Sequence, residues 1–275
     1  MAIKRRKPRS ASLRFQSFLE SKDITTTKPE RRLVVGTRRC NGRNAYGRIT
    51  VRHRGGGAYR KYRIIDFERR QRDIIGKIKT VEYDPNRNVR IGLVSYLNGA
   101  KCYMLLPEGL SVGAAVIAST QAEAKPGNSL PLKNIPVGFM VHNIEIRPNA
   151  GGTFARSAGT SAQIMGKTDN NYVTLKMPSS EIRMVSGECW ATVGVLGNAD
   201  YKNITWGKAG RSRHRGKRPG VRGMAMNPVD HPHGGGEGRS KSGKHPVTPW
   251  GKGCKGTRTR KPRRKNLLII KRRKA

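Results

Sequence analysis

The sequence predicts a mainly β protein, with two small antiparallel barrels in tandem and long, basic, irregular extensions at both ends. Three observations predict it. The middle of the 275-residue chain alternates short runs rich in β-branched residues with Gly, Pro, Asn and Asp turn signals. No segment shows a long amphipathic helical period, so we expect helices to be few and short. Both ends are rich in Lys, Arg, Gly and Pro and poor in apolar side chains.

Charge is distributed unevenly along the chain. The whole sequence has 57 Lys plus Arg against 17 Asp plus Glu, a formal net charge of +40. Residues 1–72 carry 22 basic and 5 acidic side chains, residues 73–206 carry 13 and 10, and residues 207–275 carry 22 and 2. This pattern predicts a nearly neutral folded body with two cationic arms. Arms of this charge favour an extended polyanion as the partner.

The first barrel is expected from five apolar runs between residues 61 and 120. The turn signals between them include "DPNRN" at residues 84–88 and "NG" at residues 98–99, which are typical of tight turns. Five short strands suit a small closed sheet. The predicted strands are "KYRIIDF", "IGKIKTVEYD", "VRIGLVSYL", "KCYMLLP" and "AAVIAST".

The second barrel is expected after a Pro- and Gly-containing connector, "KPGNSLPLKNIPVG". Its turns carry Asn, Gly, Asp and Ser, and it ends near Gly197. The predicted strands are "VHNIEI", "SAQIMGK", "YVTLKM", "EIRMVS" and "ATVGVLG". The expected domains are an N-terminal extension (1–60), a first barrel (61–125), a second barrel (126–200) and a C-terminal extension (201–275).

Two features bear on the compartment. The four cysteines are far apart and form no C-x-x-C pair, so free thiols in a reducing compartment are expected. No apolar run approaches the roughly 18–20 residues of a membrane span, and the basic N-terminus lacks the apolar core of a signal peptide, although its composition leaves a transit peptide open.

The stretch "DHPHGGGEGRSKSGKHP", residues 230–246, carries the richest mixture of functional groups. Its histidines lack the paired spacing and supporting fold of a zinc site. "GRSKSGKH" resembles a phosphate loop but ends in His, and no buried strand precedes it. Asp230 and Glu237 are its only carboxylates, with no rigid scaffold to hold a catalytic triad. We therefore expect no enzyme and no metal site, but glycines that allow close approach to RNA and histidines that stack on bases or hydrogen-bond to RNA.

A second cluster, "GRITVRHRGGGAYRKYR" at residues 47–63, interleaves basic, glycine and tyrosine residues. Arginine binds phosphate in bidentate fashion, and Arg, His and Tyr stack on bases, so the cluster favours RNA. A solvated loop would explain its charge but not three consecutive glycines. DNA compaction is the competing interpretation, but no recognition helix, finger or basic zipper is visible.

Several long motifs together resemble the ribosomal protein L2 family of the bacterial or organellar large subunit. They are "MNPVDHPHGGGEG", "GKHPVTPWG", "GRITVRHRGGG", "EYDPNR", "NIPVG", "ARSAGT" and "GKAGR". The resemblance implies an oligonucleotide-binding-type barrel followed by an SH3-like barrel, with both extensions buried in rRNA. Two departures stand out: Ala58 where many relatives continue with His after the glycines, and Ser180 where they have Gly, which puts the turn type there in question.

The resemblance also implies a function. It describes a structural, non-enzymatic, primary rRNA-binding protein that supports assembly, subunit association, tRNA binding and the peptidyl-transferase centre. Family RNA-contacting arginines correspond to Arg87 and Arg156, and a histidine near that centre corresponds to His231, with the chemistry left to rRNA. The other expected rRNA contacts are Arg52, His53, Arg54, Gly55, Gly56, Lys61, Arg63, Lys208, Arg211, Arg213, Arg215, Lys217, Arg218, Arg222, Asn227, His233, Gly235, Arg239, Lys244, Arg258 and Arg260.

The expected partners are large-subunit rRNA, small-subunit rRNA at an intersubunit contact, and neighbouring ribosomal proteins. No membrane, no homo-oligomer and no cofactor are expected, apart from structural magnesium held by the surrounding rRNA. The expected location is a cytoplasmic ribosome, with plastid and mitochondrial ribosomes left open. A different basic nucleic-acid-binding protein without catalysis is the alternative.

Overall fold

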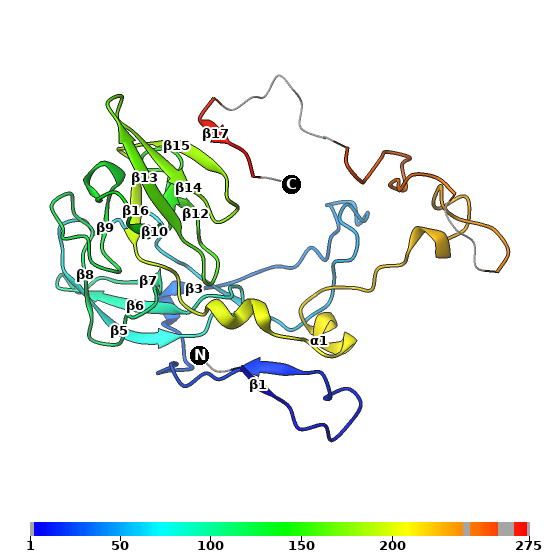
Figure 1. The fold of residues 1–275 in the computed structure, drawn as a ribbon. Helices are drawn as coiled ribbons and strands as arrows, with labels where there is room; N and C mark the ends of the chain where they lie inside the picture. The colour runs from blue at the N-terminus through cyan, green and yellow to red at the C-terminus, as the bar shows by residue number, and fades with distance from the viewer. Residues whose placement is uncertain (1–2, 239–242, 258–266, 274–275) are drawn as a thin grey trace. The chain divides into compact units, whose positions relative to one another are not determined.

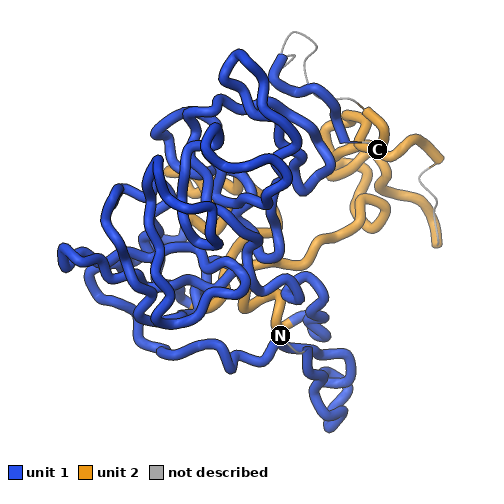
Figure 2. The backbone as a smooth tube through the Cα atoms, turned by 60° about the vertical axis from the view of Figure 1, so that its left-hand side comes forward, with its two compact units in different colours: residues 1–39, 59–209, 267–275 blue, residues 40–58, 210–266 orange. Residues whose placement is uncertain are grey.

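The computed structural model describes residues 3–238, 243–257 and 267–273. The chain divides into two compact units, the first formed by residues 1–39, 59–209 and 267–275 and the second by residues 40–58 and 210–266 (Figure 2). The regular structure is mainly β, as predicted, and the first unit contains the two small barrels in tandem (Figure 1). In the described ranges, no helix is long and apolar enough to cross a membrane.

The first barrel is built on a four-stranded antiparallel sheet with the order β7-β6-β5-β8. Alternation of buried and exposed residues along β5 directs one face into the core. The "NG" turn between β6 and β7 forms as predicted, with Gly99 at a φ of +79°. Two apolar clusters fill the interior, one around Tyr103 and one around Ile78. The strands are β5 (Gly76–Glu82), β6 (Ile91–Tyr96), β7 (Lys101–Leu105) and β8 (Ala115–Val116).

The second barrel is built on a seven-stranded sheet with the order β17-β15-β14-β13-β10-β16-β9. A separate two-stranded sheet, β11-β12, lies between β10 and β13 in the sequence. A single apolar cluster that includes Ile164 and Leu175 forms its core. The strands are β9 (Ser129–Pro131), β10 (Met140–His142), β11 (Ile144–Glu145), β12 (Gly152–Phe154), β13 (Ala162–Thr168), β14 (Tyr172–Lys176), β15 (Ile182–Ser186), β16 (Trp190–Val193) and β17 (Ile269–Lys271).

Two parts of this sheet differ from the sequence prediction. The predicted connector contains β9, which pairs with β16, and its Leu130, Leu132 and Ile135 are buried in the core. Strand β17 comes from the C-terminal extension and pairs with β15, so Leu268 accepts a backbone hydrogen bond from Met184 at 2.7 Å. Both additions are short, and such segments give little periodic signal.

The N-terminal extension contacts the first barrel through residues between Ser21 and Gly36. The Arg90 guanidinium donates to Asp23 at 2.9 Å, and the Glu30 amide donates to the Tyr103 hydroxyl at 2.8 Å. Within the extension β1 pairs with β2, while β3 pairs with β4, so the start of the predicted barrel strand "KYRIIDF" pairs with the extension and not with the four-stranded sheet. Their strands are β1 (Ile3–Arg5), β2 (Ser17–Leu19), β3 (Val34–Gly36) and β4 (Lys61–Arg63). The domain boundaries given above stay a prediction.

Helical structure is scarce, as the sequence predicts. The described residues contain one short α-helix, α1 (Ala209–His214), and four 3-10 turns. The turns are η1 (Arg31–Leu33), η2 (Leu132–Asn134), η3 (Ala199–Asn203) and η4 (Gly223–Ala225).

Candidate nucleic-acid interface

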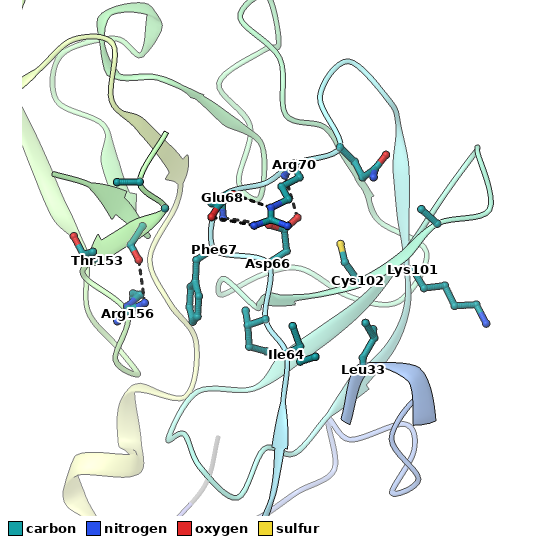
Figure 3. A pocket seen from close by; sticks show the side chains of 16 residues that line it. Leu33, Ile64, Asp66, Phe67, Glu68, Arg70, Lys101, Cys102, Thr153 and Arg156 are labelled. Carbon is teal, nitrogen blue, oxygen red and sulfur yellow. Dashed lines mark hydrogen bonds and ion pairs between the residues drawn. The ribbon is translucent and has the colours of Figure 1, made fainter. Parts of the chain in front are cut away.

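Arg87 and Arg156, which come from different barrels, meet on one aromatic ring. The guanidinium carbon of Arg156 lies 4.4 Å from the centre of the Phe67 ring, and that of Arg87 lies 5.5 Å from it. Figure 3 shows Arg156 beside Phe67, with its guanidinium group hydrogen-bonded to the backbone of the second barrel. Cations are attracted to the faces of aromatic rings, so Phe67 holds both arginines in place. The two predicted RNA-contacting arginines therefore form one site.

Local structure fixes each of these arginines further. Arg87 follows a tight turn and forms an ion pair with the fully buried carboxylate of Asp84, and it donates to the Tyr62 hydroxyl at 3.0 Å. Arg156 donates to the Gly152 carbonyl at 3.0 Å and remains exposed. Side chains held in this way lose less conformational entropy when they bind phosphate.

A pocket of about 420 Å³ opens next to this pair, lined by residues of both barrels. Its carboxylates have partners inside the protein: Asp66 accepts backbone N–H groups of the following turn, and Glu68 accepts a 2.7 Å hydrogen bond from Arg70 (Figure 3). The Arg70 bond also lowers the pKa of Glu68. Glu68 is therefore an ionised structural acceptor rather than a proton-transfer group, and Asp66 shapes the turn that follows it.

The loop that forms one wall of the pocket depends on a buried glutamate. The Glu145 carboxylate accepts backbone N–H groups from Asn149, Gly151 and Trp190 at 3.0–3.1 Å. The Nδ1 of the nearby His142 lies 2.8 Å from the Gly194 carbonyl oxygen. Because a carbonyl oxygen can only accept a hydrogen bond, Nδ1 carries the proton and donates it. Burial lowers the pKa of His142 to about 4, so its ring is neutral at pH 7.

In the second unit, the "RGGG" segment lies against residues 214–218. Gly55 donates to the Gly216 carbonyl at 3.0 Å, and Ala58 donates to the His214 carbonyl at 2.8 Å. A Cβ at Gly57 would lie 2.8 Å from the Gly216 amide nitrogen. Close approach of two backbone segments thus accounts for a glycine that the sequence analysis had attributed to RNA alone.

The "MNPVDHPHGGGEG" stretch folds on itself. His231 is only 8% exposed, and its ring lies where a Cβ at Gly223 would come within 2.5 Å. Its Nδ1 accepts the His233 backbone N–H at 3.1 Å, which leaves the ring proton of a neutral His231 on Nε2. Gly235 has a φ of +85°, and a Cβ there would lie 2.7 Å from Pro228. The glycines therefore also serve a compact loop that exists without RNA.

Comparison with known families decides what these features belong to. Residues 30–118 match the model described as "Ribosomal Proteins L2, RNA binding N-terminal domain", and residues 125–251 match "Ribosomal Proteins L2, C-terminal domain". The chain belongs to the ribosomal protein L2 family. As an L2 family member it is an rRNA-binding structural constituent of the ribosome, and the family is one of structural proteins. The Arg87 and Arg156 site combines residues from both matched domains.

The structure places most of the expected rRNA contacts of this L2 family chain at the surface. The buried exceptions are Gly55, His231 and Arg63, which donates to the Lys61 carbonyl and so offers little surface to a partner. The partly buried ones are Arg87, Arg211, Arg215, His233 and Gly235. The exposed ones are Arg52, His53, Arg54, Gly56, Lys61, Arg156, Lys208, Arg213, Lys217, Arg218, Arg222, Asn227 and Lys244. Arg239, Arg258 and Arg260 lie outside the described residues.

Sequence reasoning missed three aromatic residues. Phe67 gives no sequence signal, because it ends a predicted strand and meets Arg156 only in the fold. Trp250 is 73% exposed, with the Arg52 guanidinium 5.3 Å from its ring, and Tyr46 is 89% exposed. For these two, an aromatic residue in an acid-poor basic stretch was the available signal.

Two further sets of side chains bear on chemistry. Over the described ranges, no three His, Cys, Asp or Glu side chains gather closely enough to hold a metal ion. The four cysteines are free thiols, and burial raises the pKa of Cys189 to about 11. Such a thiol is protonated at neutral pH and a weak nucleophile.

Proposed function

We propose that this chain is a primary binder of large-subunit rRNA, on which subunit assembly, subunit association, tRNA binding and the architecture of the peptidyl-transferase centre depend. His231 would lie near that centre as part of a shaped loop, while rRNA performs the chemistry. The further partners are small-subunit rRNA at an intersubunit contact and neighbouring ribosomal proteins. No resident cofactor takes part, and magnesium belongs to the rRNA.

The observation that carries this proposal is the meeting of Arg87 and Arg156 on Phe67. Neither barrel alone supplies both arginines, so the site requires the two barrels to be packed together. An RNA that binds there would contact both barrels at once, as expected of an early-binding protein that recognises folded RNA by shape. The rigid guanidinium groups suit phosphate or base edges.

The second unit supports the same proposal. Residues 210–257 with their described neighbours 40–58 are rich in Lys, Arg and Gly, and the backbone hydrogen bonds described above preshape parts of them. Ordered RNA can supply the contacts that such a segment lacks on its own. The compact His231 loop would enter the RNA largely preformed.

Binding of the full chain to large-subunit rRNA tests the proposal. Arg87→Ala and Arg156→Ala are each expected to weaken binding by about 1–3 kcal/mol, because each removes an oriented guanidinium group. Lys125→Ala removes the same charge from an exposed residue paired with Glu123, and it should change affinity far less. Circular dichroism of each variant checks that the fold is kept.

The finer roles are tested in reconstituted large subunits. His231→Ala is expected to impair assembly or peptide-bond formation, because the loop loses the ring that packs on Gly223 and accepts the His233 amide. Equal affinity of both arginine variants for rRNA, or equal affinity of the wild type for duplex DNA of the same length, would contradict the proposal. Normal subunits with His231→Ala would remove only the role at the peptidyl-transferase centre.

A further inference from the structure

A small hairpin in the second unit presents one aromatic side chain at its tip. Arg43 and Ile49 form an antiparallel bridge, and the Asn44 amide donates to the Arg48 carbonyl at 3.0 Å. Between them Tyr46 is 89% exposed, the most exposed aromatic residue among those described. A large ring at this position removes little apolar surface from water within the chain, so folding does not explain it.

The backbone of the tip is nevertheless defined by hydrogen bonds. The Asn44 side-chain oxygen accepts the backbone N–H of Tyr46 at 3.1 Å and that of Arg48 at 3.0 Å. Gly47 takes the left-handed turn position with a φ of +74°. At the base of the hairpin the Gly42 carbonyl accepts the Thr50 N–H at 2.9 Å. Asparagine turns of this kind shape the backbone without a core, so the hairpin presents Tyr46 at its tip, away from the rest of the chain.

The surroundings of Tyr46 are strongly basic. The sequence contains no Asp or Glu between Glu30 and Asp66, and Arg43 and Arg48 flank the tip. The Tyr46 ring packs on no described aromatic or cationic group, and its hydroxyl has no hydrogen bond with a described residue. Both faces of the ring are therefore open, next to cations that attract phosphate.

We propose that Tyr46 is a stacking anchor for an unpaired base of large-subunit rRNA, distinct from the Arg87 and Arg156 site. The proposal rests on the proposed function, since it assumes rRNA binding. A ring on a protruding tip needs an exposed base face, which unpaired nucleotides offer and the interior of a duplex does not. A protein partner would have to bring acidic groups to match Arg43 and Arg48, whereas rRNA brings phosphates with every base.

Four variants of the full chain, each measured against large-subunit rRNA, test the anchor. Tyr46→Ala and Tyr46→Leu should weaken binding by about 5- to 100-fold, because both remove the flat ring. Tyr46→Phe should bind like the wild type, because the stack does not need the hydroxyl. Tyr172→Ala removes an exposed tyrosine of strand β14, outside the motifs that carry the family resemblance, and should have no effect. The salt dependence of binding should be unchanged in all four, since no phosphate contact is lost.

Chemical probing of the bound rRNA locates the base. One or a few unpaired nucleotides should lose protection with Tyr46→Ala and Tyr46→Leu and regain it with Tyr46→Phe. A footprint and affinity equal to wild type for Tyr46→Ala would overturn the anchor, as would ultraviolet crosslinking of Tyr46 to a protein rather than to rRNA in assembled subunits. A wild-type chain that shows no preference for large-subunit rRNA would instead overturn the proposed function.

Discussion

The two units of the chain keep their shape by different means. All the apolar side chains that are buried in the described residues belong to the first unit, where most of them form three clusters. In the described part of the second unit, His231 is the only buried side chain larger than a hydrogen atom. That unit relies on backbone hydrogen bonds, turn-forming asparagines and glycines at positive φ. The second unit therefore lacks the apolar burial that stabilises the first, and we expect bound rRNA to supply contacts in its place.

The difference follows from composition. Burial of apolar side chains offsets the conformational entropy lost in folding, and the first unit holds nearly all the residues able to provide it. Backbone hydrogen bonds in water contribute only modestly, so the second unit gains local order but little independent stability. Because the second unit is positively charged, we expect a negatively charged partner to provide the stability that it lacks on its own.

Truncation of a buried side chain should show the largest difference in stability between the two units. Leu175→Ala removes a fully buried side chain from the second barrel and is expected to lower the free energy of unfolding by about 2–5 kcal/mol. Val221→Ala removes an exposed side chain of the second unit and should leave unfolding unchanged within about 0.5 kcal/mol. Thermal unfolding of the RNA-free chain, followed by circular dichroism, measures both. Equal losses for the two variants would contradict the comparison.

Acid should weaken the first unit through His142. Its pKa is about 4 in the folded chain, against 6.5 for an ordinary histidine, so the unfolded state binds a proton first as the pH falls. Stability contributed by the neutral ring is complete above pH 6.5 and is lost between pH 6.5 and 4, by up to about 3 kcal/mol.

The control for this pH effect is His142→Asn, whose amide can still donate to the Gly194 carbonyl but does not titrate. Urea unfolding of the wild type and this variant at several pH values gives the difference. The wild-type free energy of unfolding should fall more steeply with acid than that of the variant. Parallel pH profiles for the two proteins would show that protonation of His142 is not the cause.

Within the first unit, the sequence predicted local strands better than long-range strand pairings, for physical reasons. Strands such as β6 and β14 are β-branched runs bounded by turns, a local signal that survives folding. Strand β17 pairs with β15 from far along the chain, and local composition contains no record of that. In the candidate site, Arg87 and Arg156 were found by resemblance, but their common contact with Phe67 is a product of the fold.

Glycines also show what composition alone does not reveal. Their abundance predicts close approach to RNA, whereas Gly57 and Gly223 are required by neighbours within the chain, Gly216 and His231. Composition identifies where backbone must come close to something. It does not identify the partner, because a second backbone segment and an RNA strand impose the same steric demand.

A turn in the second barrel provides the test with the smallest expected effect. It shows whether an unfavourable backbone conformation also lowers the stability of the unit that has an apolar core. Ser180 has a φ of +68° in the turn between β14 and β15, where its amide donates to the Met177 carbonyl at 2.9 Å. A left-handed conformation is costly for a residue with a Cβ and nearly free for glycine. Ser180→Gly is therefore expected to stabilise the first unit by about 0.5–1 kcal/mol, a rise of about 1–4 °C in Tm. Ser179→Gly is the matched control. Ser179 is also exposed but has no positive φ, so the chain entropy that glycine adds to the unfolded state should leave stability unchanged or slightly reduced. Differential scanning calorimetry of the RNA-free chain separates the two variants, and a lower Tm for Ser180→Gly than for the wild type would mean that the serine side chain, rather than the backbone, determines the stability of this turn.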